Sequence, residues 1–309
     1  MTAASRVLVT GAGGFIGRHI CELARGRGAA VYGFDLLDVP PTELEPGHYS
    51  KNSDHPEDLA HFVENVRPEI CIHAAGRASV TDSIEDPAID FRAGPVLTFE
   101  LLEALRKKAP NCRFLLLSSA AVYGNPQALP VTETQTPSPI SPYGFHKLQC
   151  ELLCREFTRV YDLRTSIVRI FSAYGEGLRR QVLWDICRQL ATNGAVMLRG
   201  TGHETRDFLH VADVADGVLL VAERARMAGE VYNLASGRQT SVREIALIAA
   251  AALERETTPN FDGVVPQGDP LNWQADITQI EALGFEPKIA LETGVRAYAG
   301  WCRLQLTDA

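Results

Sequence analysis

The fold is decided by a short stretch between a strand pattern and a helix pattern, Thr10-Gly11-Ala12-Gly13-Gly14-Phe15-Ile16-Gly17. An apolar run at 7–9 leads into it, and apolar residues recur at helical spacing after it. In this setting Gly11 permits a tight turn, Gly14 lets a dinucleotide pyrophosphate approach the start of the helix, and Gly17 lets that helix pack closely on the strand. A plain tight turn is the alternative, and the strand–turn–helix context argues against it.

Strand and helix patterns alternate through much of the chain. Apolar or β-branched runs indicate strands at 7–9, 30–34, 70–72, 113–117, 167–170 and 231–234, and helical periodicity appears at 59–66, 96–107 and 242–253. Ser141 can cap a further helix, with Pro142 at its first position. The alternation predicts an α/β fold of the Rossmann type, a doubly wound parallel sheet covered on both faces.

The rhythm becomes less regular after residue 172, where glycine-rich turns and prolines separate shorter pieces. We therefore expect a dinucleotide-binding domain over 1–172 and a smaller, mainly substrate-binding lobe over 173–309. The strand pattern near 231–235 is expected to return to the sheet of the first domain.

Asp35 stands at the end of the second expected strand. A carboxylate there accepts hydrogen bonds from the adenosine ribose hydroxyls and repels a 2′-phosphate, which favours NAD over NADP. Asp38 is an alternative candidate for binding the ribose. Asp35 could alternatively be a solvated loop residue without a binding role.

Composition excludes several classes of function. The formal net charge is -8, which disfavours binding to nucleic acid or to an anionic membrane. No apolar stretch approaches the ~20 residues of a membrane span, and the N-terminal residues lack the pattern of a signal peptide. The seven cysteines are scattered without a CxxC pair, so we expect reduced thiols in a cytoplasmic protein and no metal site.

Tyr143 and Lys147 fall four residues apart on the helix that Ser141 begins, and so share one face. A free tyrosine is a poor base because its pKa is ~10. A nearby ammonium and a bound nicotinamide cation would stabilise the phenolate, and Tyr143 would then accept a proton from a sugar hydroxyl.

Further motifs accompany this pair. They are His73-Ala74-Ala75-Gly76, Ser118-Ser119-Ala120-Ala121-Val122-Tyr123-Gly124, Pro142 to Lys147, Arg206-Asp207-Phe208-Leu209-His210-Val211 and Gly268-Asp269-Pro270. With the glycine turn, they make the chain resemble, nearly end to end, the extended short-chain dehydrogenase/reductases of the NDP-sugar epimerase/dehydratase group.

The resemblance implies a role for each matching residue. Ser119 would orient the substrate oxygen, Tyr143 would be the acid/base, and Lys147 would bind the nicotinamide ribose. Arg206 would grip the diphosphate of the sugar nucleotide. The full cofactor set would be Gly11, Gly13, Gly14, Phe15, Ile16, Gly17, Asp35, Ala74, Ala75, Gly76, Tyr143 and Lys147. The substrate set would be Ser119, Tyr123, Ser172 and Arg206, with Tyr123 either lining the sugar pocket or packing beneath it.

Several positions depart from the pattern of this group. Ala120 and Ala121 stand where dehydratases and decarboxylases carry acids, which argues against those reactions. Gly94 replaces a helix asparagine, Pro266 replaces an arginine, and Ser172 stands where epimerases often carry asparagine. These departures leave the identity of the sugar and of the nucleotide base open.

The resulting hypothesis is an NAD-dependent NDP-sugar 4-epimerase that oxidises C4 transiently and returns the hydride to the opposite face. The alternatives are a reductase of an NDP-4-keto-6-deoxy sugar and a catalytically silent nucleotide-binding regulator. By the same resemblance, the helices at 96–107 and 143–161 would form the face of a homodimer.

Overall fold

A computed structural model describes residues 5–37, 40–42, 44–45, 47–51, 56–264, 268 and 270–307. Its centre is a seven-stranded sheet in the order β11-β6-β5-β4-β1-β2-β3, in which every pairing is parallel. The strands are β1 (Arg6–Thr10), β2 (Ala30–Asp35), β3 (Tyr49–Lys51), β4 (Ile70–His73), β5 (Arg113–Ser119), β6 (Arg164–Ile170) and β11 (Ala228–Leu234). The predicted doubly wound α/β fold is therefore confirmed.

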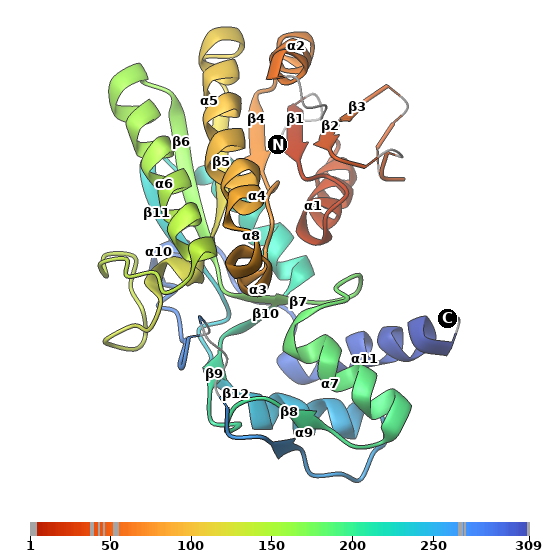
Figure 1. Cartoon of the computed structure of the whole chain (residues 1–309). Coiled ribbons are helices and arrows are strands. Elements are labelled where there is room, and N and C mark those ends of the chain that lie inside the picture. The colour runs from red at the N-terminus through yellow and green to blue at the C-terminus, as the bar shows by residue number, and fades with distance from the viewer. Residues whose placement is uncertain are drawn as a thin grey trace.

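Helices cover both faces of this sheet (Figure 1). On one face lie α1 (Phe15–Gly26) and α8 (Val211–Arg224), and on the other lie α2 (Pro56–Val66), α5 (Leu97–Lys108) and α6 (Pro142–Tyr161). Alternate residues of each strand serve the two faces, so Leu115 and Leu117 join the α1/α8 core while Phe114 and Leu116 join the α5/α6 core. Burial on both faces explains why the strands read as continuous apolar runs.

The strand order reverses around β1, since β4 lies on one side of it and β2 on the other. In sheets of this kind the crevice at such a switch point, outside the carboxyl ends of the strands, is the usual ligand site. The glycine turn follows β1 at this point, and residues 74–76 follow β4.

Strand β11 comes late in the chain and pairs with β6 at the edge of the sheet. It contains residues 231–234 of the stretch near 231–235 that the sequence predicts to return to the sheet. The proposed division at residue 172 stays a prediction, because α8 and β11 both belong to the sheet layer although they follow that residue.

Three helices, α7 (Gln181–Asn193), α9 (Val242–Ala252) and α11 (Leu291–Thr307), enclose a separate apolar core. Figure 1 places them beyond the carboxyl ends of the sheet strands. Short strands complete this part: β7 (Ser172–Tyr174) with β10 (Phe208–His210), β9 (Thr205–Arg206) with β12 (Thr240–Ser241), and β8 (Met197–Leu198) with β13 (Asn260–Phe261). Helix α10 (Thr278–Glu281) instead contacts β11 and buries Ile280 in the α1/α8 core.

The helix at 142–161 begins as the sequence predicted. The Ser141 hydroxyl accepts a hydrogen bond from the amide of Gly144 at 3.2 Å, and Pro142 occupies the first turn. Unpredicted elements precede it: α3 (Val80–Glu85), α4 (Pro87–Phe91) and a π-helical turn, Arg92–Val96, that contains Gly94 and Pro95. A 3-10 turn, Ala120–Tyr123, follows β5.

Among the described residues, no helix is long and apolar enough to cross a membrane.

Candidate active site

Two glycines of the turn, Gly11 and Gly17, have no room for a side chain. Gly11 has φ of 69°, and a Cβ there would lie 2.7 Å from the amide nitrogen of Ala75. A Cβ at Gly17 would lie 2.0 Å from the carbonyl oxygen of Gly11, so any side chain would push α1 off the turn. Gly14 precedes α1 without a side-chain cap, so the first amides of the helix stay open to an anion.

Asp35 is held against the same turn. One of its carboxylate oxygens accepts a hydrogen bond from the amide of Gly13 at 2.7 Å, and the other accepts one from Leu36 at 2.6 Å. A carboxylate has about four acceptor positions, so two remain for hydroxyl groups of a ligand. Its alternative, Asp38, lies outside the described residues, as do Pro266 and Asp269.

Thr10 joins the two strand ends that flank the crevice. Its hydroxyl lies 2.6 Å from Nδ1 of His73 and accepts a hydrogen bond from the amide of Ala75 at 3.3 Å. On the other side of the ring, Nε2 of His73 lies 3.1 Å from the hydroxyl of Thr98. Burial, with a smaller contribution from Lys147, lowers the pKa of His73 to about 3. This histidine is therefore a neutral packing residue.

Tyr143 and Lys147 share one face of α6, as their spacing predicted. The ammonium of Lys147 donates a hydrogen bond to the carbonyl of Leu117 at 2.9 Å and lies 6.0 Å from the centre of the Tyr143 ring. It also lies 3.7 Å from the point where a Cβ of Gly76 would stand. Lys147 thus lies among Tyr143, β5 and the segment after β4.

Ser119 ends β5 beside this pair. Its hydroxyl accepts a hydrogen bond from the amide of Ala121 at 3.2 Å, which begins the 3-10 turn. Gly144 packs against that turn, since a Cβ there would lie 2.6 Å from the carbonyl oxygen of Ala121. A glycine after Tyr143 therefore allows α6 to approach the segment that carries Ser119.

Two contacts at the start of α6 were missed by sequence reasoning. Ser83 of α3 is buried, and its hydroxyl accepts a hydrogen bond from the amide of Tyr143 at 3.1 Å. Gly94, in the π-helical turn, faces α6: a Cβ there would lie 3.8 Å from Sγ of Cys150 and 3.9 Å from Cβ of His146. The carbonyl of Gly94 accepts a hydrogen bond from the Thr98 hydroxyl at 2.9 Å. Neither the serine in the short helix α3 nor the glycine in the π-helical turn carries a local signal for these contacts.

The expected substrate residues occupy different surroundings. Tyr123 is 1% exposed, and its hydroxyl donates to Asn233 at 2.7 Å, an arrangement that fits packing beneath the pocket rather than lining it. Ser172 lies at the start of β7 and is half-buried. Arg206 is half-buried in β9, with its guanidinium 5.5 Å from the centre of the Trp273 indole.

Asp207, the neighbour of Arg206, has a structural role. Its carboxylate is fully buried and accepts hydrogen bonds from the amide and hydroxyl of Ser236 and from the amide of Ala275. Burial raises its pKa to about 6, although these hydrogen bonds act in the other direction. Asp207 therefore ties β9 and β10 to two later loops.

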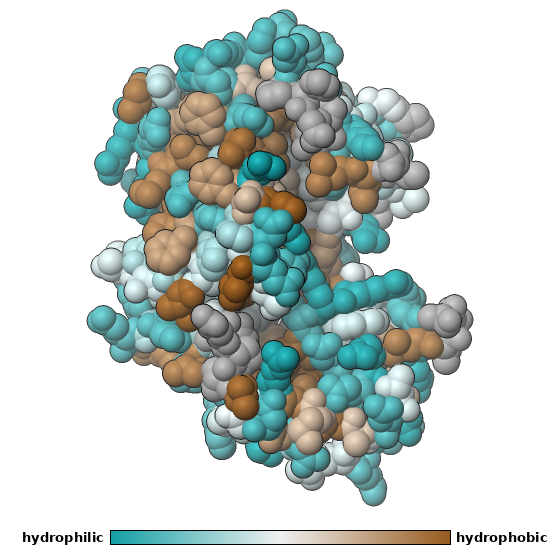
Figure 2. All heavy atoms as spheres, in the orientation of Figure 1, coloured by the Kyte–Doolittle hydropathy of each residue, from teal (hydrophilic) through white to brown (hydrophobic). Residues whose placement is uncertain are grey.

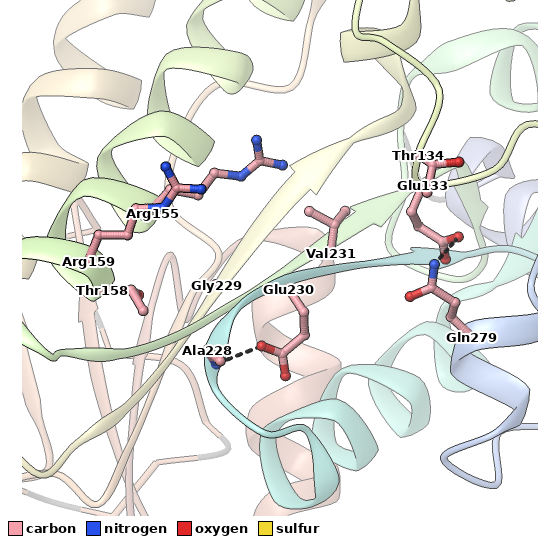
Figure 3. A pocket seen from close by; sticks show the side chains of 10 residues that line it. All are labelled: Glu133, Thr134, Arg155, Thr158, Arg159, Ala228, Gly229, Glu230, Val231 and Gln279. Atoms are coloured by element: carbon pink, nitrogen blue, oxygen red, sulfur yellow. Dashed lines mark hydrogen bonds between the residues drawn. The ribbon is translucent and has the colours of Figure 1, made fainter.

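A polar pocket of about 340 Å³ opens along the outer edge of β11 (Figure 3). Arg155 and Arg159 of α6 line one end of it, and Glu133 and Gln279 line the other, joined by a 2.9 Å hydrogen bond. It contains none of the site residues expected from the sequence.

Residues 7–235 match the NAD dependent epimerase/dehydratase family. The chain belongs to this family.

Its relatives cover nearly the whole chain. A UDP-glucose 4-epimerase from Mycolicibacterium smegmatis is 31% identical over 308 residues, with 94% of this chain and 96% of that protein covered. A GDP-6-deoxy-D-mannose reductase from Pseudomonas aeruginosa is 31% identical over 304 residues, with 94% and 95% covered. The crystal structure of the Thermus thermophilus UDP-glucose 4-epimerase in complex with NAD is 28% identical, covers 96% of this chain and 99% of that one, and has a TM-score of 0.86.

Proposed function

We propose that the protein is an NAD-dependent NDP-sugar 4-epimerase that acts by transient oxidation at C4 of a nucleotide-diphosphate sugar. The observation that carries this proposal is the position of Lys147, between Tyr143 and the Gly76 segment at the carboxyl edge of the sheet. Family membership and the epimerases among its relatives support it.

The residues of the crevice fit NAD. The steric limits at Gly11 and Gly17 and the uncapped start of α1 suit a pyrophosphate, and Asp35 offers acceptors to ribose hydroxyls. When bound, NAD supplies the acceptor, and later the donor, of the hydride.

The chain's own residues manage the proton and the geometry. Tyr143 takes the proton of the 4-hydroxyl and later returns it. Lys147 stabilises the negative charge of the phenolate because its ammonium is held on the same side. Ser119 donates a hydrogen bond to the substrate oxygen as its charge changes.

The substrate's diphosphate is assigned to Arg206, whose planar guanidinium suits bidentate phosphate contacts. Ala120 and Ala121 are buried and carry no ionisable group, so no second acid stands after Ser119 to assist a dehydration. This favours epimerisation over dehydration or decarboxylation.

The test is a screen of sugar nucleotides with the protein as purified and no added cofactor. We expect NMR to show a 4-epimer pair approaching equilibrium, and mass spectrometry to find NAD in the protein. The reductase relative makes reduction of an NDP-4-keto-6-deoxy sugar the second candidate. Turnover that requires added NAD(P)H and consumes it in proportion would establish the reductase instead. Absence of turnover on every sugar nucleotide would favour the third hypothesis, a catalytically silent nucleotide-binding regulator.

A homodimer through α5 and α6 is part of the proposal. Figure 2 shows apolar side chains gathered over these helices. An apolar groove lies where α5 and α6 meet α4 and the π-helical turn, and four of its lining residues are more than a third exposed: Phe91, Val96, Phe99 and Leu152. An apolar groove of this kind suits a second copy of the same chain by two-fold symmetry. We also propose a cytoplasmic location, because all seven cysteines, which lie in the described part of the chain, are buried and form no disulfide.

A further inference from the structure

One row of polar side chains crosses the sheet directly behind the candidate site. Ser118, Arg169 and Asn233 are register partners on β5, β6 and β11, and therefore point to the same face. Their neighbours on the same face, two positions earlier in each strand, belong to the apolar core beneath α5 and α6: Leu116, Ile167 and Val231. All three are buried, so this row needs internal partners.

Glu151 of α6 supplies the partner for Ser118 and Arg169, whereas Asn233 bonds the Tyr123 hydroxyl and the carbonyl of Val131. The carboxylate of Glu151 accepts two hydrogen bonds from the Arg169 guanidinium, at 2.9 and 2.6 Å, and a third from the Ser118 hydroxyl at 2.6 Å. The side chains of Glu151 and Arg169 are 0% and 1% exposed. Arg169 also lies 4.6 Å above the centre of the Tyr123 ring.

The place of Glu151 on α6 gives the pair its significance. Tyr143, Lys147 and Glu151 follow one another at intervals of four residues and share a helix face, so Glu151 comes ~6 Å along the axis after Lys147. A lysine and a glutamate at this spacing normally attract each other. Here the ammonium of Lys147 donates to the carbonyl of Leu117, while Arg169 and Ser118 occupy the carboxylate of Glu151.

We propose that Arg169 is a positioning residue that neutralises Glu151, so that Lys147 stays directed toward Tyr143 and Ser118 is fixed next to Ser119. The proposal rests on the proposed function for its catalytic meaning. Arg169 touches neither substrate nor cofactor and acts through Lys147 and through the end of β5. The ion pair leaves the region behind Lys147 without net charge.

The other ionisable groups that face this region add little charge. Burial raises the pKa of Tyr123 to about 12 and raises the pKa values of the thiols of Cys150 and Cys154, so these groups stay neutral at pH 7. His73 of β4 is neutral as well. The remaining groups are Glu133, whose backbone carbonyl lies 3.5 Å from the Arg169 guanidinium and whose pKa is raised by burial, and the Asp90–His146 contact between α4 and α6.

The charge balance can be tested without turnover. Ionisation of tyrosine raises absorbance near 295 nm. The difference between the absorbance titrations of a protein with and without Tyr143→Phe gives the titration of Tyr143. In Arg169→Met the buried carboxylate is left uncompensated, so we expect the Tyr143 midpoint to rise by about one pH unit, from a unit charge ~12 Å away at an effective dielectric constant of ~20. In Glu151→Gln it should fall by a similar amount, and in the double variant Glu151→Gln/Arg169→Met it should return to the wild-type value.

Catalysis gives the second reading. We expect kcat of Arg169→Met to fall about tenfold or more, because a displaced Lys147 and Ser119 lose alignment, while KM changes much less. Arg164→Met is the matched control, since it removes the same charge from the exposed start of β6. It should leave both the titration and kcat unchanged.

Removing one charge of a buried pair can prevent folding, so the test uses both single variants, Arg169→Met and Glu151→Gln. If Arg169→Met does not fold, the shift of the Tyr143 midpoint in Glu151→Gln decides the test. If the Glu151–Arg169 pair only stabilises the fold, the midpoint of the Tyr143 titration should be the same in every folded variant. That result would overturn the proposal. A wild-type protein without epimerase activity would instead refute the proposed function, because the titration does not depend on turnover.

Discussion

The hydroxyl of Thr10 and Nδ1 of His73 lie 2.6 Å apart at the carboxyl ends of two paired strands, β1 and β4. Because the histidine is buried, its pKa falls from 6.5 to about 3. The folded state then binds fewer protons than the unfolded state at pH values between these two. Stability contributed by the neutral ring is complete above pH 6.5 and is lost as the pH falls below it.

We therefore expect the free energy of unfolding to decrease by about 1 kcal/mol more between pH 6.5 and pH 5.5 in the wild type than in His73→Gln. Urea unfolding at pH 6.5 and 5.5 measures this. Asp207, whose pKa is raised to about 6, contributes in the opposite direction but equally in both proteins. Parallel pH dependences in the two proteins would show that His73 takes up a proton without unfolding.

Tyr143→Phe removes only the phenolic oxygen from the face of α6 that Lys147 shares. We expect NAD content to stay normal and turnover to fall at least ~100-fold, the lower range for loss of a general acid–base group. Steady-state rates and cofactor content after purification are the measurements. Near-normal activity would remove Tyr143 from the reaction.

Asp35→Ala removes the carboxylate that accepts hydrogen bonds from Gly13 and Leu36 beside the glycine turn. We expect weaker NAD binding and a smaller preference for NAD over NADP, since repulsion of the 2′-phosphate is lost. Titrating both cofactors into cofactor-stripped protein gives the ratio. If that ratio does not change, another group reads the ribose.

Arg206→Ala should raise KM for the sugar nucleotide about 30-fold without changing NAD content, as expected for loss of ~2 kcal/mol of charge-assisted hydrogen bonding. The matched control is the double variant Arg179→Ala/Arg180→Ala, which removes two exposed arginines before α7. Loss of affinity in the double variant alone would place the diphosphate against the loop at 177–180.

Phe99→Lys and Leu152→Lys place charges in the groove between α5 and α6, where the wild-type side chains are 47% and 53% exposed. Light scattering should report a dimer for the wild type and a monomer for the variants, because a buried unpaired charge opposes association. Leu304→Lys, which changes a leucine on α11 that is 62% exposed, is the control and should leave the dimer intact. A monomeric wild type would refute the dimer.

Much of the fold was predictable because its signals are local. Apolar periodicity located the central strands, and the Ser141–Pro142 pair located the start of α6, since a cap depends on residues three positions apart. Helix α8 was not predicted, although its apolar residues place it firmly against α1. The four-residue spacing also predicted that Tyr143 and Lys147 share a face.

The sequence by itself determined the glycine turn, the strand–helix alternation and the Tyr143/Lys147 face, because each depends on backbone geometry over a few residues. Only the tertiary structure decided that Glu151 bonds Arg169 and Ser118, which are 18 and 33 positions away, and that the Tyr123 hydroxyl is buried against Asn233. Those contacts arise from strand order and register, which bring β5, β6 and β11 side by side. No local periodicity encodes that order, because it is set by the packing of the whole sheet against its helices.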